Sequence, residues 1–557
     1  TDRGIQLQCL LVRLDRLTKR SIRRIGLSAT IHDYSSSQSW LSAGSKRNCS
    51  LVESIGVGRK LNLAVYHFSC RDDDEKAKEE LLQKEYDYLY NQTKGQKCLV
   101  FTNRRVDSEY VAAELRKRAE FNKEPDIFFV HHGSISALFR LEAESALRES
   151  DKPAVAIATN TLELGIDLGS VNKVIQMGAV SACSSFVQRL GRTGRRGSQA
   201  VMRFITDNYI FKGDDFKNIP WHLIQNIAVI QLYLEERWVE SFINKPCPYS
   251  LLFHQMLSTL MQLELTPVEL AKRIYTLPAF SLLSEEDYIS LYKHLLKTDM
   301  IEKTESGTLI PGLKGEQIAG NYRFLSVFAD PNGYHVKHKQ REIGEIFFIP
   351  EIDEVILLAG REWKVTELDI DRKNIYVIPT QSKKKKAQWF SEGPDIDDRI
   401  VKRMKRVLLE KQEYGYLSDN AKEALAYARK ITKNYSIHKQ YTTLNDKLIL
   451  IHPWFGSKKL RTLIFLLKYF LKEKLEIQEV VNTSRLSIIV ASEQISEEFW
   501  KSLVFAVQDI KPEDILSFAP ATPLDKYDRY IPDILLQKAY VYNYLDIAGL
   551  KESLFDD

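Results

Sequence analysis

The sequence has no apolar run of about 20 residues and no secretory or transit signal, so neither a membrane span nor a membrane partner is expected. Its six cysteines are scattered without a CxxC pair, which argues against a zinc site or a disulfide framework and for a reducing, cytoplasmic location. No Gly-Lys dipeptide occurs anywhere in the chain. The chain therefore lacks the phosphate-binding loop GxxxxGKS or GxxxxGKT that many nucleotide-binding proteins carry.

What is present is the composition of an ordinary folded protein, with 44% hydrophobic and 27% charged residues. A length of 557 residues predicts several domains, because single cores rarely grow beyond about 250–300 residues. The net charge of +5 neither supports nor excludes nucleic-acid binding, since a groove needs only a locally basic surface. The chain begins with Thr1 rather than Met, so we expect a truncated start.

The segment from Leu61 to Ile205 alternates short apolar runs with helical patterns. Continuous apolar runs are typical of strands buried on both faces of a parallel sheet, and Asp107 to Glu120 between two of them has helical periodicity. This βαβ series predicts an α/β fold with a doubly wound parallel sheet. The expected strands are 97–101, 128–130, 154–158, 174–176 and 200–205.

From Pro220 onward the pattern changes to amphipathic helices. Thr266, Pro267 and Glu269 predict a capped helix start, and Ser284 opens another helix in the same way. Two short strands around a polar turn at 305–307 follow, which completes the order of a winged-helix module. Residues 323–379 are strand-rich and predict a small antiparallel barrel or sandwich, with strands at 347–349, 355–358, 362–367 and 374–378.

Residues 188–195 hold arginines at positions 189, 192 and 195, interrupted by two glycines. The guanidinium group pairs well with phosphate oxygens and keeps its charge, so this segment is a candidate phosphate sensor. The alternative is a solvated basic turn.

Further polar residues follow the expected strands, and open α/β sheets bind ligands at the carboxyl ends of their strands. Thr159 and Thr161 could donate hydroxyl bonds to a phosphodiester backbone, although the segment could also be a plain strand-end turn. Thr102, Arg104 and Ser134 could hold successive phosphates of a single strand. The pair His131-His132 has no third ligand at metal spacing, so no metal site is expected. Trp389 could stack on a base or simply cap the core of the barrel.

Three segments, taken in chain order, resemble motifs III, V and VI of superfamily 2 helicases. They are Ser28-Ala29-Thr30, residues 158–167 and residues 188–195. The resemblance implies that Arg192 and Arg195 are fingers at a nucleotide γ-phosphate, with Gln188 and Arg189 at the edge of the cleft. It further implies that Gly165 allows close backbone approach, that Asp167 meets the ribose or orients the fingers, and that Ser28 and Thr30 couple the two motor domains. ATP and Mg²⁺ are the implied cofactors.

The downstream half resembles the Lhr (large helicase-related) group. The resemblance is carried by 238–240, 248–250, 343–344, 360–365, Trp389 with Glu392, 452–456 and 530–536. It implies a RecA-like motor that moves 3′ to 5′ on single-stranded DNA and unwinds duplex DNA or RNA–DNA hybrids, in DNA repair or phage defence.

The chain departs from this group because the phosphate loop and the acidic Asp-Glu-x-His box have no counterpart. We therefore expect no ATP hydrolysis by the chain alone, and expect the missing half of the first motor domain to be supplied in cis or in trans. Two other interpretations stay open, namely a non-enzymatic nucleic-acid-binding subunit and a related RNA helicase. The expected domains are 1–55 (end of RecA-like motor domain 1), 56–212 (RecA-like motor domain 2), 213–312 (winged helix with a lead-in helix) and 313–557 (accessory domain with a β-barrel and a helical part).

Overall fold

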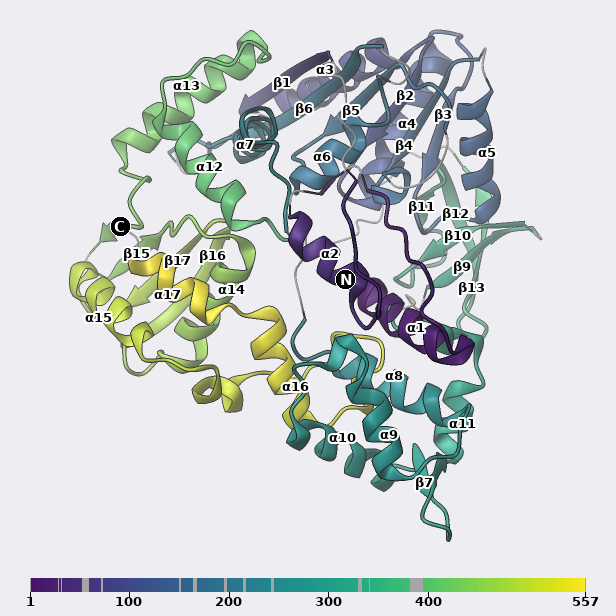
Figure 1. Ribbon diagram of the computed structural model, residues 1–557. Coiled ribbons are helices and arrows are strands. Elements are labelled where there is room, and N and C mark those ends of the chain that lie inside the picture. The colour runs from purple at the N-terminus through teal and green to yellow at the C-terminus, as the bar shows by residue number, and fades with distance from the viewer. Residues whose placement is uncertain are drawn as a thin grey trace. The chain divides into compact units, whose positions relative to one another are not determined.

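The computed structural model describes residues 2–28, 30–31, 33–52, 60–71, 74–149, 152–163, 168–194, 198–213, 217–241, 245–328, 333–339, 341–380, 394–445 and 447–555. The chain divides into two compact units (Figure 1). Unit 1 contains 1–54, 241–330 and 441–557, and unit 2 contains 55–240 and 331–440. No helix in the described ranges is long and apolar enough to cross a membrane.

Unit 2 is built on a six-stranded sheet in the order β1-β6-β5-β2-β4-β3, and every neighbouring pair is parallel. The five strands predicted from apolar runs are all present, and the predicted α/β class is confirmed. The central strands β2 and β4 are buried at every position, as helices on both faces of a sheet require. The strand bounds are β1 (Leu61–Arg71), β2 (Lys97–Phe101), β3 (Phe128–His131), β4 (Ala154–Ala158), β5 (Lys173–Met177) and β6 (Ala200–Ile210).

Five helices accompany these strands, and α4 (Arg105–Phe121) lies where helical periodicity predicted it. The other four are α3 (Glu75–Thr93), α5 (Ala137–Arg148), α6 (Cys183–Leu190) and α7 (Trp221–Glu236). Two later helices belong to the same unit, α12 (Asp398–Leu409), which packs on α7, and α13 (Asp419–Asn434), which packs beside β1.

A second, five-stranded sheet of unit 2 has the order β10-β9-β13-β12-β11. Three of its four strand pairs are antiparallel as predicted, whereas β9 and β13 run parallel. The predicted strand at 347–349 is wrong, because the strand there ends at Ile346. The inner face shares one hydrophobic core with α4 and the parallel sheet. The bounds are β9 (Tyr334–His338), β10 (Arg341–Ile346), β11 (Val355–Leu358), β12 (Arg361–Asp369) and β13 (Asn374–Pro379).

Unit 1 contains the helices and wing of the predicted winged-helix module. Thr266 and Glu269 form the predicted capping box of α9, and Ser284 caps α10 by accepting the Asp287 N–H. The elements are α8 (Tyr249–Leu260), α9 (Pro267–Tyr275), α10 (Glu285–Lys297), the wing strands β7 (Ile301–Lys303) and β8 (Leu309–Pro311), and α11 (Leu313–Ala319).

The first helix, α1 (Asp2–Thr18), packs on this module through two arginines. Arg13 donates to the Ser258 carbonyl at the end of α8, and Arg16 donates to the Arg273 carbonyl at the end of α9. Carbonyl groups at a helix end lack intrahelical partners and carry partial negative charge. The two arginines therefore cap two helices of the module at once.

The pattern of residues 24–30 is typical of a short buried strand, but the structure has no strand at the described residues of this segment. Residues 21–28 form no regular structure, and Ile25 and Leu27 are 71% and 94% exposed. A strand needs a neighbour to pair its backbone groups, and none of the described sheets supplies one here. The helix α2 (Tyr34–Ser42) follows.

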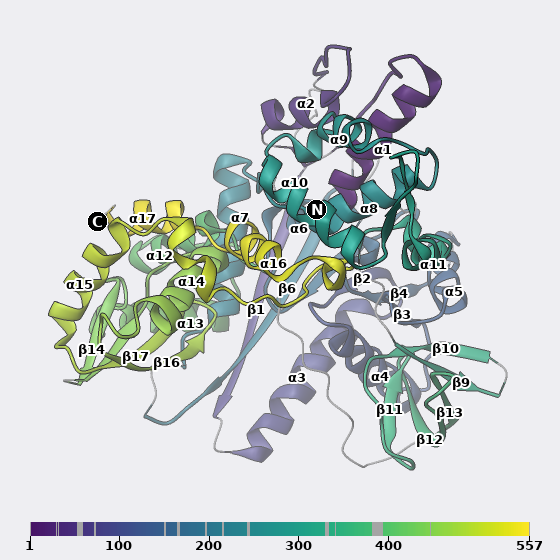
Figure 2. The ribbon, with the colours of Figure 1, turned by 90° about the horizontal axis from the view of Figure 1, so that it is seen from below.

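The end of the chain forms a four-stranded antiparallel sheet covered by helices, with its own core (Figure 2). Its strands are β14 (Tyr441–Asn445), β15 (Leu448–Ile451), β16 (Ile477–Ser484) and β17 (Ser487–Ser492), and its helices are α14 (Ser457–Phe465), α15 (Ser496–Gln508), α16 (Asp533–Ala539) and α17 (Ile547–Phe555). Short helical turns lie at 160–162, 278–280, 322–325, 466–470, 512–518, 528–530 and 540–544.

Candidate functional site

The carboxyl edge of the parallel sheet in unit 2 holds the described residues that are predicted to bind a nucleic-acid strand. Thr102 follows β2, Ser134 follows β3, and Thr159 and Thr161 follow β4. Because parallel strands end at one edge, these polar groups share that edge, where ligands of such sheets bind. Gly165, Asp167, Arg195 and Trp389 lie outside the described residues.

An arginine next to the predicted one contacts Ser134. Arg105 donates from Nη1 to the Ser134 hydroxyl over 2.8 Å, and its guanidinium lies 5.4 Å from the centre of the Phe347 ring. The predicted Arg104 instead forms a half-exposed ion pair with Asp107 at 2.7 Å. Thr102 is buried, and its hydroxyl donates to the Arg104 carbonyl over 3.0 Å. Spacing alone could not decide between two adjacent arginines, because the turn into α4 decides which one faces β3.

The two threonines after β4 are less accessible than the pattern suggested. The Thr161 hydroxyl lies 2.8 Å from both the His131 carbonyl oxygen and His131 Nδ1, so its hydrogen-bonding capacity is already used within the fold. Thr159 is only 8% exposed. Contact of either hydroxyl with a phosphodiester stays a prediction.

The arginine segment is held by an acid that the sequence reading missed, Glu163. Arg189 is buried, donates from Nε to the Glu163 carboxylate over 2.7 Å and also bonds Gln176. Its guanidinium lies 4.7 Å from the centre of the Phe101 ring, and burial lowers its pKa while Glu163 opposes that shift. These contacts give Arg189 a positioning role inside the sheet. Direct nucleotide contact by Arg189 remains a prediction.

The same acid segment fixes Arg192, which donates from Nη2 to the Glu163 carbonyl over 2.7 Å. Gln188 lies in the last turn of α6 and Arg192 lies two residues beyond its end, and both are partly exposed. Gly194 has φ +71°, and a Cβ there would lie 2.7–2.9 Å from atoms of Ala200. Only glycine fits this close turn, so Gly194 determines the backbone conformation two residues after Arg192.

Ser28 and Thr30 belong to unit 1, whereas the parallel sheet belongs to unit 2. The Thr30 N–H donates to the Ser28 hydroxyl over 3.2 Å, which forms a local turn. Ser28 is exposed.

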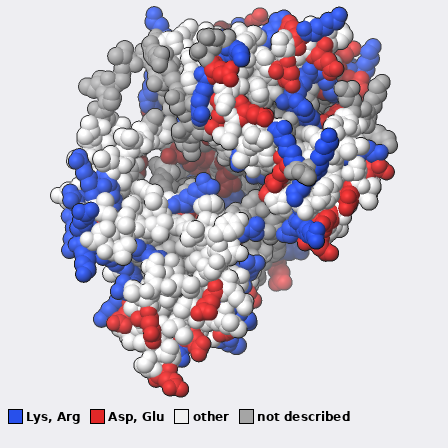
Figure 3. All heavy atoms as spheres, turned by 90° about the vertical axis from the view of Figure 1, so that its right-hand side faces the viewer, with Lys and Arg blue, Asp and Glu red and all other residues white. Residues whose placement is uncertain are grey.

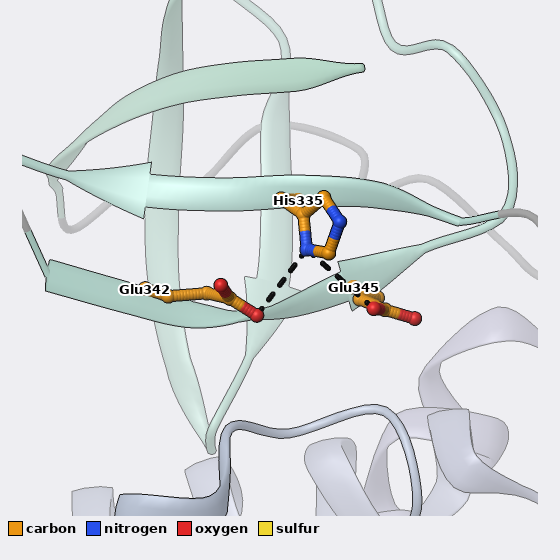
Figure 4. A group of neighbouring side chains, drawn as sticks. All are labelled: His335, Glu342 and Glu345. Carbon is orange, nitrogen blue, oxygen red and sulfur yellow. Dashed lines mark hydrogen bonds and ion pairs between the residues drawn. The ribbon is translucent and has the colours of Figure 1, made fainter. Parts of the chain in front are cut away.

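One group among the described residues has the make-up of a metal site. His335 on β9 lies between Glu342 and Glu345 on β10, with Nδ1 3.3 and 3.5 Å from the two carboxylates (Figure 4). Hydrogen bonding between the imidazole and the two carboxylates accounts for this geometry, and all three side chains are in contact with solvent. We therefore assign no metal to it.

Charge is mixed over the face of the molecule drawn in Figure 3. Both basic and acidic side chains occur across the face drawn in Figure 3, separated by uncharged residues. This distribution fits the modest net charge of +5. Any grip on a polyanion must therefore come from local groups such as Arg105 rather than from the field of the whole chain.

Residues 77–197 match the family described as the helicase conserved C-terminal domain. The matched residues include most of the parallel sheet and the arginine segment, so this part of the chain resembles the C-terminal domain of helicases.

Similarity to known proteins extends beyond that domain. The ATP-dependent helicase Lhr-Core of Saccharolobus solfataricus is 25% identical over 503 residues, 84% of this chain and 55% of that protein. Lhr-Core of Methanocaldococcus jannaschii is 35% identical over 196 residues, 35% of this chain and 22% of that protein. The structure of Mycobacterium smegmatis helicase Lhr bound to ssDNA and AMP-PNP matches with a TM-score of 0.66 at 16% identity, over 99% of this chain and 74% of that one.

The chain is similar in sequence to Lhr-type ATP-dependent helicases. It spans 55% of the length of one of these curated relatives and 22% of the other.

Proposed function

We propose that this chain is the part of an ATP-dependent DNA helicase that carries the second motor domain, a winged helix and an accessory domain. In this proposal it moves 3′ to 5′ on single-stranded DNA and unwinds duplex DNA or RNA–DNA hybrids in DNA repair or phage defence. The observation that carries the proposal is that one parallel sheet holds both the Arg105–Ser134 pair and the arginine segment whose Arg192 bonds the Glu163 carbonyl. The names of its relatives as ATP-dependent helicases support it.

The proposed role of each residue follows from the chemistry of its side chain. Arg192 and Arg195 stabilise charge on the transferred phosphoryl group, and Gln188 lies beside them. Gly165, Asp167 and Arg189 meet the nucleotide, and the bond from Arg189 to Glu163 also holds the arginine segment in place. Ser134, Thr102, Arg104, Thr159 and Thr161 track the phosphates of the strand, while Trp389 stacks on a base.

The residues present suit ATP from one side only. Guanidinium groups can meet its phosphates, but the chain has no phosphate loop to cradle them and no acidic box to hold Mg²⁺. We propose that the missing half of motor domain 1 supplies both, in cis or in trans, and that Ser28 and Thr30 couple the two motor domains. The domain limits 1–55, 56–212, 213–312 and 313–557 and a cytoplasmic location belong to the same proposal.

The test joins this chain to an upstream segment that carries a phosphate loop and an Asp-Glu-x-His box. DNA-stimulated ATP hydrolysis is expected, and Arg192→Ala should reduce it by about 10³-fold or more while the affinity for single-stranded DNA stays within about twofold. Arg148→Ala is the matched control, because Arg148 pairs with Glu144 on the surface of α5. An equal loss of DNA affinity in the Arg192 variant would refute the finger assignment.

Substrate choice is tested by the same protein on matched DNA and RNA duplexes. Motor domains of this kind grip the backbone more than the bases, so unwinding of RNA alone would favour the related RNA helicase. Absence of hydrolysis with any upstream segment, together with salt-sensitive DNA binding, would favour the non-enzymatic subunit.

A further inference from the structure

The loop after β3, which carries Ser134, is held in place by the five-stranded sheet. Backbone pairing is the first link, since the Glu345 N–H donates to the Ser134 carbonyl over 2.7 Å and the Ser136 N–H donates to the Ile343 carbonyl over 2.9 Å. β10 thus serves as a strand partner for residues 134–136. Gly344 makes the close approach possible, because a Cβ there would collide with the Ser134 carbonyl.

A buried carboxylate is the second link. Glu109 on α4 is 3% exposed and accepts the backbone N–H groups of Ala359 and Gly360, the Ala359 bond being 2.8 Å long. These two residues form the turn between β11 and β12, with φ of +55° and +66°. A two-residue turn of this left-handed kind points its N–H groups the same way, and here both meet one side chain of the motor domain.

The same carboxylate fixes a histidine beside Ser134. His132 is 1% exposed, and its Nε2 lies 2.8 Å from the Glu109 carboxylate. A carboxylate can only accept, so the ring carries its proton on Nε2 and leaves Nδ1 as an acceptor. Nδ1 accepts the Ser134 N–H over 3.2 Å, and the Ser134 hydroxyl accepts from Arg105 over 2.8 Å.

We infer that Glu109 is a positioning residue for strand binding, which acts through His132 on Ser134 and Arg105 and makes the five-stranded sheet a structural part of the strand-binding edge. This inference rests on the proposed function, in which Ser134 meets the DNA backbone. Glu109 itself is too deeply buried to touch DNA. Its removal therefore acts on affinity only by loosening the groups that do.

The experiment measures the affinity of the full chain for a fluorescent single-stranded oligonucleotide, with thermal midpoints recorded in parallel. Glu109→Gln keeps the shape but turns an amide NH₂ toward N–H donors, and we expect DNA affinity to fall by about three- to tenfold. The control is Glu114→Gln on the same helix, because Glu114 pairs only with Lys117 and Arg118 in the described structure; its affinity should stay within about twofold.

A double-variant cycle separates positioning from general destabilisation. Ser134→Ala removes the hydroxyl at the end of the relay, so Glu109→Gln combined with Ser134→Ala should bind no more weakly than the weaker single variant. Losses that multiply, or a lowered thermal midpoint with unchanged affinity, would overturn the inference. If Glu109→Gln does not fold, His132→Asn replaces it, since its amide oxygen can still accept the Ser134 N–H while the link to Glu109 is cut, and the same loss of affinity is expected.

The two proposals fail in different ways. A wild-type chain that binds no single-stranded DNA contradicts the proposed function. A wild-type chain that binds, with Glu109→Gln unchanged, contradicts only the positioning role.

Discussion

Replacing Arg189 by methionine should destabilise unit 2 strongly, because it leaves the Glu163 carboxylate buried without its partner. Arg189 is 5% exposed and Glu163 is 6% exposed. The carboxylate now receives Arg189 through both Nε and Nη2, plus a 3.3 Å bond from the Ser185 hydroxyl. After the substitution only the Ser185 bond among these three remains for a full negative charge in the sheet interior.

The expected cost is about 3–5 kcal/mol, the usual range when one partner of a buried ion pair is removed. Replacing both partners by apolar residues of similar size is often close to neutral, since no uncompensated charge remains. The double variant Arg189→Met with Glu163→Met should therefore recover most of the loss, even though it restores no hydrogen bond.

The assay is native-state hydrogen exchange of amides in β5 and α6, which reports local stability without assuming a single unfolding step for a chain of several cores. A loss of less than about 1 kcal/mol in Arg189→Met would refute the reasoning. So would a double variant as unstable as the single one, because the cost would then lie in lost packing rather than in stranded charge.

Three further outcomes follow from single residues. Burial, with Asp207 nearby, raises the pKa of Glu85 to about 8 from 4.5. Because the folded state holds this proton more tightly than the unfolded chain, stability should fall as pH rises from 4.5 through about 8. Thermal midpoints of Glu85→Gln measured across that range should lack this slope. Burial lowers the pKa of His254 to about 4 from 6.5. The neutral ring should therefore contribute fully to stability above pH 6.5, and this contribution should be lost as pH falls toward 4. The stability of His254→Gln should change less over the same acid range. Gly194→Ala places a side chain at φ +71° against Ala200 and should lower stability by about 1–3 kcal/mol. In the reconstituted helicase, the rate of ATP hydrolysis should fall more than the affinity for DNA. Equal losses of both would contradict a role confined to the arginine turn.

Local patterns predicted the elements well where the chain itself contains the cause. Apolar runs such as Ala154–Ala158 are strands because burial on both faces demands them. The caps at Thr266 and Ser284 are correct because a side chain and the backbone a few residues ahead suffice to make them.

Elements that depend on distant partners were less predictable. The stretch at 24–28 has the apolar character of a strand but no partner strand in the described structure. The parallel pairing of β9 with β13 joins segments far apart in sequence, and no local signal encodes it. At the candidate site, Glu163 was missed because its importance comes from two arginines that reach it only after folding.

The two arginines of α1 also bear on how such proteins can be recombined. Arg13 and Arg16 bond carbonyls at the ends of α8 and α9 from outside the module, and at α9 this adds to the bond that the Arg273 carbonyl accepts from the Thr276 hydroxyl. A chimera that exchanges the winged-helix segment between relatives, without exchanging residues 2–18, would leave those carbonyl ends facing a foreign helix. Inheritance should therefore keep the two segments matched, although more than two hundred residues separate Arg13 from its partner Ser258 (245 positions).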